Sequence, residues 1–514
     1  MMIMKKYIII LVCSLLGVVS CYDDDSHVAT KLLNDIVIDG LKDTSAISCS
    51  TVLDLIPEVS GYSEEELSYA WYIYGGEFEK QTDKGYRTVQ IDSVKNLSWA
   101  VDVKKGDYTL VFEVTNKESG YAVMEEVKLT VSTAFSRGFY ILKETSDGNT
   151  DLDIYNERNK QLMTNVLDGT QGDAMRGKPR NLSVIYEKAH VDPETAASGY
   201  TTTVFVGAGE RDMACFRTED LVKIFDRSTL LYGEMSEEEV PYCMASAGAH
   251  NFFFSSKGIR GDYAGMFGSE YTTGRLGYPK GNGASSFVQA CDGRGLMFWN
   301  EQQHRLCYFA GDEVEEIEYM GGEIIWDDVR AIATGWNHLA GENTMWYMFE
   351  SQNGQRYLVL INPKFEVVEV RRLSSSLHIA NADIIAGNGL SSYSIYSVHN
   401  NQLYRYSLSE DASEVLLSLP GSIEGQITYL SDIYFGKSFD YIVIGTQAGD
   451  NYALYMYEIQ GGQPYGEPVH VVKGNGKIKQ VRYVSQSITW AMIPNYYAFT
   501  DYASMFGMGP DFPY

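Results

Sequence analysis

The chain has 514 residues and a formal net charge of −27, with 68 acidic against 41 basic side chains. The phosphate backbone of a nucleic acid repels so acidic a protein, so nucleic acid is not expected as a partner. Aromatic residues make up 13% of the chain and only 12 residues are proline, a composition typical of β-rich folds, and the length is enough for more than one domain.

Residues 1–20 have the pattern of a secretory signal peptide. Lys5 and Lys6 precede an apolar run, YIIILVCSLLGVV, which is well short of the roughly 20 residues that a membrane-spanning helix needs. The motif VVSC at 18–21 resembles the lipoprotein box of bacteria, although leucine is more common than valine at its first position. The resemblance implies that Cys21 is lipidated and becomes the N-terminus, and acyl chains would anchor it to a membrane. An ordinary signal peptide with a chance cysteine is the alternative.

Three aspartates, Asp23, Asp24 and Asp25, follow this cysteine almost directly. An acidic cluster at this position resembles the surface-export signal of Bacteroidetes lipoproteins. The resemblance implies a lipid-anchored protein of the outer membrane that faces the cell exterior. The alternative is an acidic spacer that keeps the chain away from an anionic surface. Residues 21–45 are expected to form the lipidated N-terminus and a linker.

Residues 46–133 are predicted to form a β-sandwich of the immunoglobulin type. Short strands follow one another between turn signals, and side chains alternate between two faces along YTLVFEV at 108–114. Tyr69 and Trp71, together with the later GDYTLVFEVTN, resemble PKD-like domains, in which the tryptophan packs in the core. The resemblance implies a spacer or adhesion module without a ligand site, and spacer is our interpretation.

Residues 134–514 contain a repeating unit of strands. Seven β-rich runs recur at steps of 64, 49, 44, 49, 48 and 48 residues, with anchors at Phe139, Thr203, Phe252, Leu296, Met345, Tyr393 and Tyr441. A unit of one inner strand and two or three strands further outward predicts the blades of a β-propeller. The polar insert EKAHVDPETAASG would account for the long first step.

Seven blades are expected, and eight remain open because residues 487–499 follow Tyr441 by about one period. We interpret 487–499 as the strand that closes the ring against the first blade, because closure removes exposed strand edges. An open series of hairpins or a β-solenoid is the alternative. The fold prediction is therefore all-β, with an Ig-like sandwich followed by a propeller.

The order of these segments resembles the PKD-like family of Bacteroidetes surface lipoproteins. Members of that family often open the propeller with a strand like GFYIL at 138–142 and an aspartate-rich hairpin like that at 147–153. The resemblance implies an accessory role beside importers of the SusC/SusD kind, so an outer-membrane SusC-like transporter and a SusD-like lipoprotein are the expected partners.

Seven cysteines are present, of which Cys13 lies in the signal peptide and Cys21 at the anchor. The remaining five have no CxxC spacing, which argues against a zinc site or a full disulfide framework. Buried free thiols are expected. One disulfide within the group Cys215, Cys243, Cys291 and Cys307 remains open.

Candidate chemistry is sparse. The series Asp147, Asn149, Asp151 and Asp153 resembles a calcium loop at first, but Leu152 and Arg158 stand where an EF-hand needs glycine and glutamate. A hairpin turn is the preferred interpretation and calcium the alternative. The sequence has no sialidase box, HExxH or GxSxG motif, so neither a cofactor nor an enzymatic activity is expected.

Ligand binding is the more plausible activity of the propeller. The loops at 321–328 and 374–381 are expected to join one blade to the next on a single face, which would place Trp326 and His378 on one ligand-binding rim. The alternative for Trp326 is packing between blades, and Trp299 and Trp346 are expected in blade cores.

The predicted function is that of a non-enzymatic accessory subunit of a nutrient importer that captures oligopeptides or oligosaccharides. A surface glycoside hydrolase or peptidase and a host-glycan adhesin are the alternatives. Peptide or glycan preference, the location of the ligand site and the oligomeric state stay open.

Overall fold

The structure is a computed structural model that describes residues 34–48, 51–78, 80–81, 85–193, 195–247, 250–261, 273–277, 280–281, 283–291, 295–310, 313–339, 342–389, 392–421, 423–435 and 439–485. The signal peptide, Cys21, the three aspartates after it, Cys49 and the expected closing strand at 487–499 lie outside these residues. The chain divides into two compact units between Val131 and Ser132. No helix within the described ranges is long and apolar enough to cross a membrane.

The first unit is a β-sandwich. Its main sheet has the strand order β2-β11-β10-β5-β8, and smaller pairs are formed by β1 with β4, β3 with β9 and β6 with β7. The elements are β1 (Val37–Asp39), β2 (Thr44–Ile47), β3 (Val52–Leu55), β4 (Glu58–Ser60), the 3₁₀ helix η1 (Glu64–Glu66), β5 (Leu67–Gly75), β6 (Lys80–Gln81), β7 (Gly85–Tyr86), β8 (Val89–Asp92), β9 (Leu97–Ala100), β10 (Gly106–Asn116) and β11 (Ala122–Ser132).

The core of this unit forms around Trp71, as the sequence predicts. The Trp71 ring is fully buried and stacks on Phe112 with centroids 4.5 Å apart, while its Nε1 donates to the carbonyl of Val94 at 3.1 Å. The expected linker at residues 21–45 needs one correction, because part of it belongs to the sandwich. β1 lies within this range and β2 crosses its end, and they pair with the later strands β4 and β11. Polar residues around these short strands conceal their pairing in the sequence.

The described residues of the second unit form seven sheets, which we number as blades 1 to 7 in ring order. They are β39-β12-β13-β14, β15–β18, β19–β21, β22–β25, β26–β29 with β31, β30 with β32–β34, and β35–β38. Their strands are β12 (Gly138–Glu144), β13 (Thr150–Asn156), β14 (Gln161–Met163), β15 (Pro179–Val191), β16 (Ser198–Ala208), β17 (Asp212–Arg217), β18 (Lys223–Asp226), β19 (Pro241–Ala247), β20 (His250–Ser255), β21 (Gly258–Gly261), β22 (Val288–Cys291), β23 (Gly295–Asn300), β24 (Arg305–Ala310), β25 (Glu313–Glu316), β26 (Val329–Leu339), β27 (Glu342–Ser351), β28 (Arg356–Ile361), β29 (Val367–Arg372), β30 (Ile384–Ala386), β31 (Asn388–Gly389), β32 (Ser394–His399), β33 (Gln402–Ser407), β34 (Glu414–Leu416), β35 (Gln426–Phe435), β36 (Phe439–Ala448), β37 (Asn451–Gln460), β38 (Gln463–Asn475) and β39 (Lys477–Val484). Between strands, the described residues form the short helices α2 (Val166–Gln171), η3 (Trp326–Asp328) and η4 (Ile379–Asn381).

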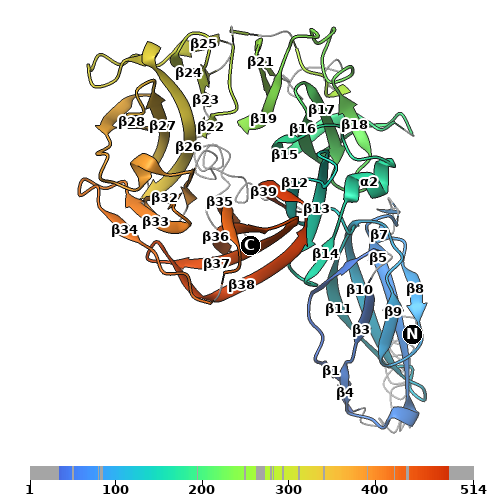
Figure 1. The fold of residues 1–514 in the computed structure, drawn as a ribbon. Coiled ribbons are helices and arrows are strands. Elements are labelled where there is room, and N and C mark those ends of the chain that lie inside the picture. Colours follow the sequence, from blue (N-terminus) through green and yellow to red (C-terminus); the bar gives the residue numbers. More distant parts are fainter. Residues whose placement is uncertain are drawn as a thin grey trace, which may run out of the picture. The chain divides into compact units, whose positions relative to one another are not determined.

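These sheets form a closed ring. The first strand of each blade contacts the first strand of the next, in the order β39, β15, β19, β22, β26, β30, β35 and back to β39. Figure 1 shows the blades set around a common centre, with β18, β25, β34 and β38 at the periphery. The second unit is therefore a β-propeller, and its described residues form seven blades.

The strand that closes the ring differs from the expected one. β39 pairs antiparallel with β12, from Gly138 opposite Val484 to Glu144 opposite Lys477, so closure is made by residues 477–484. The principle of closure against the first blade is correct, but the segment chosen from the sequence is wrong. The alternation of lysines and apolar residues in KIKQVRYV looks like a solvent-exposed strand, and that pattern conceals its place in the ring.

The periodic anchors of the sequence lie in the second strand of each blade and not, as expected, in the inner strand. Tyr393 is placed directly before its second strand, β32. Phe139 lies in β12 and Met345 in β27, each of which has a neighbouring strand on both sides. Such strands are buried on both faces by adjacent blades and therefore become continuously apolar. The inner strands border the centre of the ring and keep polar residues, so the sequence pattern is weaker there.

The expected insert accounts for part of the long first step of the repeat. Most of EKAHVDPETAASG belongs to the long hairpin of β15 and β16, with only residues 192–197 between the two strands. The additional helix α2 lies in the same interval. Both features lengthen the step between the first two anchors.

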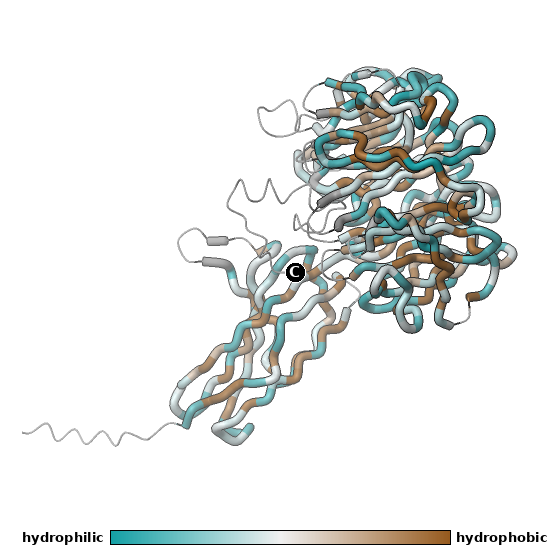
Figure 2. Tube along the Cα trace, turned by 90° about the vertical axis from the view of Figure 1, so that its left-hand side faces the viewer, coloured by the Kyte–Doolittle hydropathy of each residue, from teal (hydrophilic) through white to brown (hydrophobic). Residues whose placement is uncertain are grey.

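The hydrophobic cores of the propeller lie largely between adjacent blades. Trp299 and Trp346 are buried, as predicted, with 1% and 0% of their surface exposed. Both pack with residues of neighbouring blades. In Figure 2 much of the hydrophobic colouring follows the strands of the propeller, while the loops between them are mostly hydrophilic. The loops are thus the parts of the propeller that can meet a polar ligand.

Candidate functional site

The strand order brings several loop residues to one end of the central channel. Because neighbouring strands run antiparallel, the start of an inner strand and the turn between the second and third strands lie at the same end of a blade. A cavity of about 610 Å³ opens there, at the starts of β15, β19 and β39. We call this cavity the channel mouth, and it is lined by Pro179, Arg180, Asn181, Glu210, Arg211, Val240, Tyr242, Ser286, Glu301 and Lys479.

The channel mouth carries three cations and two carboxylates. Arg180 donates from Nη1 to the backbone carbonyl of Glu210, and Arg211 donates from Nη1 to the backbone carbonyl of Glu237 at 2.8 Å. Across the residues that the structure describes, neither arginine nor Lys479 has an ion-pair partner within 4 Å. The two arginines are therefore held in place by neutral acceptors and keep their charge available.

Tyr242 adds an aromatic ring to the channel mouth. Burial and the charge of Glu301 raise the pKa of its phenol, while Arg180 acts in the opposite direction. The phenol is therefore neutral at physiological pH and can both donate and accept a hydrogen bond.

Another arginine lies deeper in the ring, three residues after Lys479 on β39. Arg482 is within electrostatic reach of Tyr429 on β35 and Cys243 on β19, and its Nη1 donates to the carbonyl of Val481 at 3.1 Å. Burial lowers the pKa of this guanidinium. The inner strands thus carry positive charge from the mouth toward the interior.

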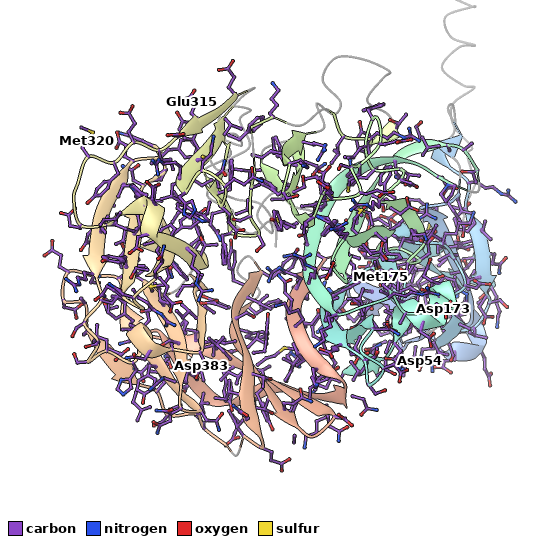
Figure 3. The ribbon with its side chains drawn as sticks, turned by 45° about the horizontal axis from the view of Figure 1, so that its top comes forward. Asp54, Asp173, Met175, Glu315, Met320 and Asp383 are labelled. Atoms are coloured by element: carbon purple, nitrogen blue, oxygen red, sulfur yellow. The ribbon has the colours of Figure 1, made fainter. Side chains whose placement is uncertain are left out.

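Trp326 takes the packing role that the sequence left open. It lies in η3, is half-buried, and its ring is 6.0 Å from that of Trp299 and 5.4 Å from that of Phe349. It therefore extends the hydrophobic core between blades 4 and 5. Nearby, Met320 and Ile325 are 96% and 69% exposed, and Figure 3 shows the Met320 side chain at the surface.

His378 belongs to a different blade contact. Its ring stacks on Tyr404 of β33 with centroids 4.0 Å apart, and its Nδ1 lies 2.9 Å from Glu414 of β34. The side chain remains 45% exposed, so a ligand can reach it. The described contacts do not join His378 to Trp326, and whether either one binds a ligand stays a prediction.

The aspartate-rich hairpin holds blade 1 together through protein donors. The side chain of Asp151 accepts from the backbone N–H groups of Leu167 at 2.9 Å and Asp168 at 3.3 Å, at the start of α2. Asp147 is exposed, and Asn149 accepts from the backbone N–H of Gly177 at 3.1 Å.

Asp153 is fully buried and forms an ion pair with Lys143 at 2.6 Å. It also accepts from the Tyr452 hydroxyl at 2.6 Å and from the N–H of Asn165 at 2.8 Å. These carboxylates are occupied by donors from the chain itself, and the described residues contain no group of three or more His, Cys, Asp or Glu suited to a metal ion. The hairpin therefore acts as a structural cluster.

The described cysteine side chains are not placed for nucleophilic chemistry. Cys215, Cys243 and Cys307 are free and buried, so no disulfide joins them to one another. Burial raises the pKa of each thiol to about 12, which keeps all three protonated.

A second cavity, of about 500 Å³, lies between blades 1 and 2 and is lined in part by Asp173 and Met175 (Figure 3). Two of its charged side chains are engaged locally: Arg227 donates to the carbonyls of Arg211 and Glu239, and Asp226 accepts from Ser228.

The N-terminal part of the chain is similar to a known family. Residues 21–179 match the PKD-like family. The match covers under a third of the chain, begins at Cys21 and extends through the sandwich into the first strands of the propeller. A search of curated proteins finds no relative.

Several solved structures are similar to this chain at low identity. A quinonprotein alcohol dehydrogenase-like protein from Bacteroides thetaiotaomicron is 13% identical, with 86% of this chain and 97% of that chain covered and a TM-score of 0.39. Aleuria aurantia lectin, solved with Fucα1-6GlcNAc, is 8% identical, with coverages of 74% and 93% and a TM-score of 0.30. The periplasmic gluconolactonase of Pseudomonas aeruginosa is 10% identical, with coverages of 82% and 100% and a TM-score of 0.25. Similarities at this level carry no functional argument.

The cations of the channel mouth were not predicted from the sequence. Arg180 and Lys479 are about 300 residues apart, and only ring closure brings β15 and β39 together. The available signal was the basic character of KIKQVR in a strongly acidic chain.

Proposed function

We propose that this protein is a non-enzymatic binding lipoprotein of the outer-membrane surface. In this proposal Cys21 carries the lipid, Asp23, Asp24 and Asp25 direct export, the sandwich acts as a spacer, and the propeller binds the ligand. The observation that carries the proposal is the channel mouth, a polar cavity of about 610 Å³ in which three cations outnumber two carboxylates. Its volume is in the range of small-molecule sites, which supports ligand capture.

The protein would act as an accessory subunit of an importer of the SusC/SusD kind and help to capture oligosaccharides or oligopeptides. Support comes from the match to the PKD-like family that begins at Cys21, and from a propeller whose loops can hold a ligand close to a transporter. The lipid anchor would confine both proteins to one membrane, which raises their effective concentration toward each other.

Co-purification tests the importer role. The tagged, lipidated protein would be recovered from outer membrane solubilised in a mild detergent, and the bound proteins would be identified by mass spectrometry. We expect near-stoichiometric recovery of a TonB-dependent barrel and a SusD-like lipoprotein. Repeated recovery of the lipoprotein alone would contradict the importer role. Hydrolysis of oligosaccharides or peptides by the purified protein would contradict the non-enzymatic assignment.

A further inference from the structure

The channel mouth concentrates positive charge in a strongly acidic protein. Arg180 and Arg211 come from blade 2 and Lys479 from the closing strand of blade 1, so three separate segments deliver cations to one cavity. Glu210 and Glu301 are exposed at the same cavity, and the local balance is three positive charges against two negative. A chain with a net charge of −27 holds these cations together at the end of its central channel.

The positive charge continues below the mouth. Arg482 lies on the same inner strand as Lys479, and the ionisable groups that act on its charge are the side chains of Tyr429 and Cys243. Arg482 does not line the cavity itself, but a partly dehydrated guanidinium on the same strand attracts an anion more strongly than one in bulk water, because the surroundings screen it less. The electrostatic environment therefore favours a ligand that carries a carboxylate.

The other lining groups favour a sugar acid over a peptide. Glu210, Glu301, Asn181 and Ser286 can accept hydrogen bonds from hydroxyl groups, and the ring of Tyr242 offers a flat surface for a pyranose. Pro179 and Val240 are the only apolar aliphatic side chains that line the described cavity, which leaves little surface for hydrophobic peptide side chains.

We propose that the channel mouth binds a carboxylate-bearing oligosaccharide, with the sugar carboxylate at Arg180, Arg211 and Lys479 and the hydroxyl groups at the carboxylates and amide of the rim. This inference rests on the proposed function, since it names the ligand class of the same site. Arginine suits the role because its planar guanidinium can bind a carboxylate through two hydrogen bonds.

Calorimetric titration of the full chain in detergent tests this inference. The probes are trigalacturonate and its fully methyl-esterified form, which has the same rings and hydroxyl groups but no charge. We expect the acid to bind and the ester to bind at least about tenfold more weakly, a difference of about 1.4 kcal/mol. The affinity for the acid should also fall as ionic strength rises.

Matched variants locate the effect. The double variant Arg180→Gln/Lys479→Gln is expected to weaken trigalacturonate binding by about tenfold or more, and Arg180→Lys should retain more affinity than Arg180→Gln. The control is Lys160→Gln/Lys364→Gln, which removes the same charge from two exposed lysines in turns at the opposite ends of blades 1 and 5. This control should bind like the unmodified protein.

Three results would overturn the inference. Equal binding of acid and ester, or full affinity in Arg180→Gln/Lys479→Gln, would show that the cations do not hold the ligand. Binding of triglutamate at least as tight as that of trigalacturonate would assign the mouth to acidic peptides. Failure of trigalacturonate to bind would remove the sugar-acid assignment, while co-purification with the importer would still decide the proposed function independently.

Discussion

One buried ion pair inside the propeller joins blades 1 and 7. Lys143 and Asp153 pair across β12 and β13 with 2% and 0% of their side chains exposed, and Tyr452 of blade 7 donates to the same carboxylate. A buried ion pair adds little net stability when complete, but removal of one partner leaves an uncompensated charge. This cluster therefore makes blade 1 depend on the correct placement of blade 7.

The Lys143→Met variant tests this dependence. It leaves the Asp153 carboxylate buried without its cation, and we expect it to lower the free energy of unfolding of the propeller by about 3 kcal/mol. Urea unfolding followed by circular dichroism would measure the change, and Lys143→Met/Asp153→Asn should recover part of the loss. Lys178→Met is the matched control, because this lysine is 77% exposed and lies 3.8 Å from Glu144. Equal stability of Lys143→Met and the unmodified protein would contradict the argument.

A second buried acid makes the propeller sensitive to pH. Asp432 on β35 is 5% exposed, and burial together with the adjacent Asp440 raises its pKa well above the usual range. Tyr396 is close to both carboxyls, and its own pKa is raised by burial and by their charge. The fold thus favours the protonated form of Asp432.

The sign of the pH effect follows from linkage. The unfolded chain releases this proton above about pH 4, whereas the folded chain keeps it until the raised pKa is reached. The contribution of Asp432 to stability is therefore complete below about pH 4 and is lost as the pH rises toward the folded pKa. Asp432→Asn should lose less stability than the unmodified protein between pH 4 and pH 8.

Urea midpoints across this pH range would measure the difference. The control is Asp383→Asn, because Asp383 is exposed and its side chain stands at the surface in Figure 3. Parallel stability profiles for Asp432→Asn and the unmodified protein would show that this carboxyl does not titrate between the folded and unfolded states.

At the scale of elements, the strands of one blade carry different kinds of sequence. β12 and β13 are buried along nearly their whole length, whereas β39 alternates between exposed and buried residues. A strand with neighbours on both sides can be entirely apolar, while a strand beside the central channel cannot. The innermost strand is therefore the hardest to recognise from sequence, although it closes the ring.

Removal of β39 should open the propeller. A chain that ends at Asn475 leaves β12 with an unpaired edge, and exposed edges promote association between chains. We expect oligomers or aggregates in size-exclusion chromatography and loss of the cooperative unfolding transition. A chain that ends at Ser485 keeps β39 and separates the effect of the strand from that of the residues after it. A monomeric, cooperatively folded chain ending at Asn475 would contradict a closing role for β39.

At the scale of the whole molecule, two units with separate cores divide the expected tasks. The sandwich is built around Trp71 and Phe112, and none of the sandwich residues that the structure describes lines the channel mouth. The propeller carries the candidate ligand site. The two units can therefore be altered independently.

Export to the cell surface can be tested at the acidic cluster after Cys21. In Asp23→Asn/Asp24→Asn/Asp25→Asn we expect lipidation to persist but the protein to become protected from protease added to intact cells. Incorporation of a labelled fatty acid and protease shaving would measure these two properties. The control Glu64→Gln/Glu65→Gln/Glu66→Gln removes the same charge from η1 and should leave the protein accessible. Continued surface exposure of the aspartate variant would argue for a simple acidic spacer.

The sequence alone determined the architecture of this protein, because alternation and a period of 44–49 residues are properties of consecutive residues. It placed Trp71, Trp299 and Trp346 in cores for the same local reason, since each lies within a recognisable strand. The tertiary structure alone decided that residues 477–484 close the ring, that Trp326 packs between blades, and that Asp153 meets Lys143 and Tyr452. It also determined which residues line the channel mouth. Arg180 and Lys479 come together there only when β39 pairs with β12 of the first blade. Contacts between segments about 300 residues apart have no local pattern, and they arise from the closure of the whole ring.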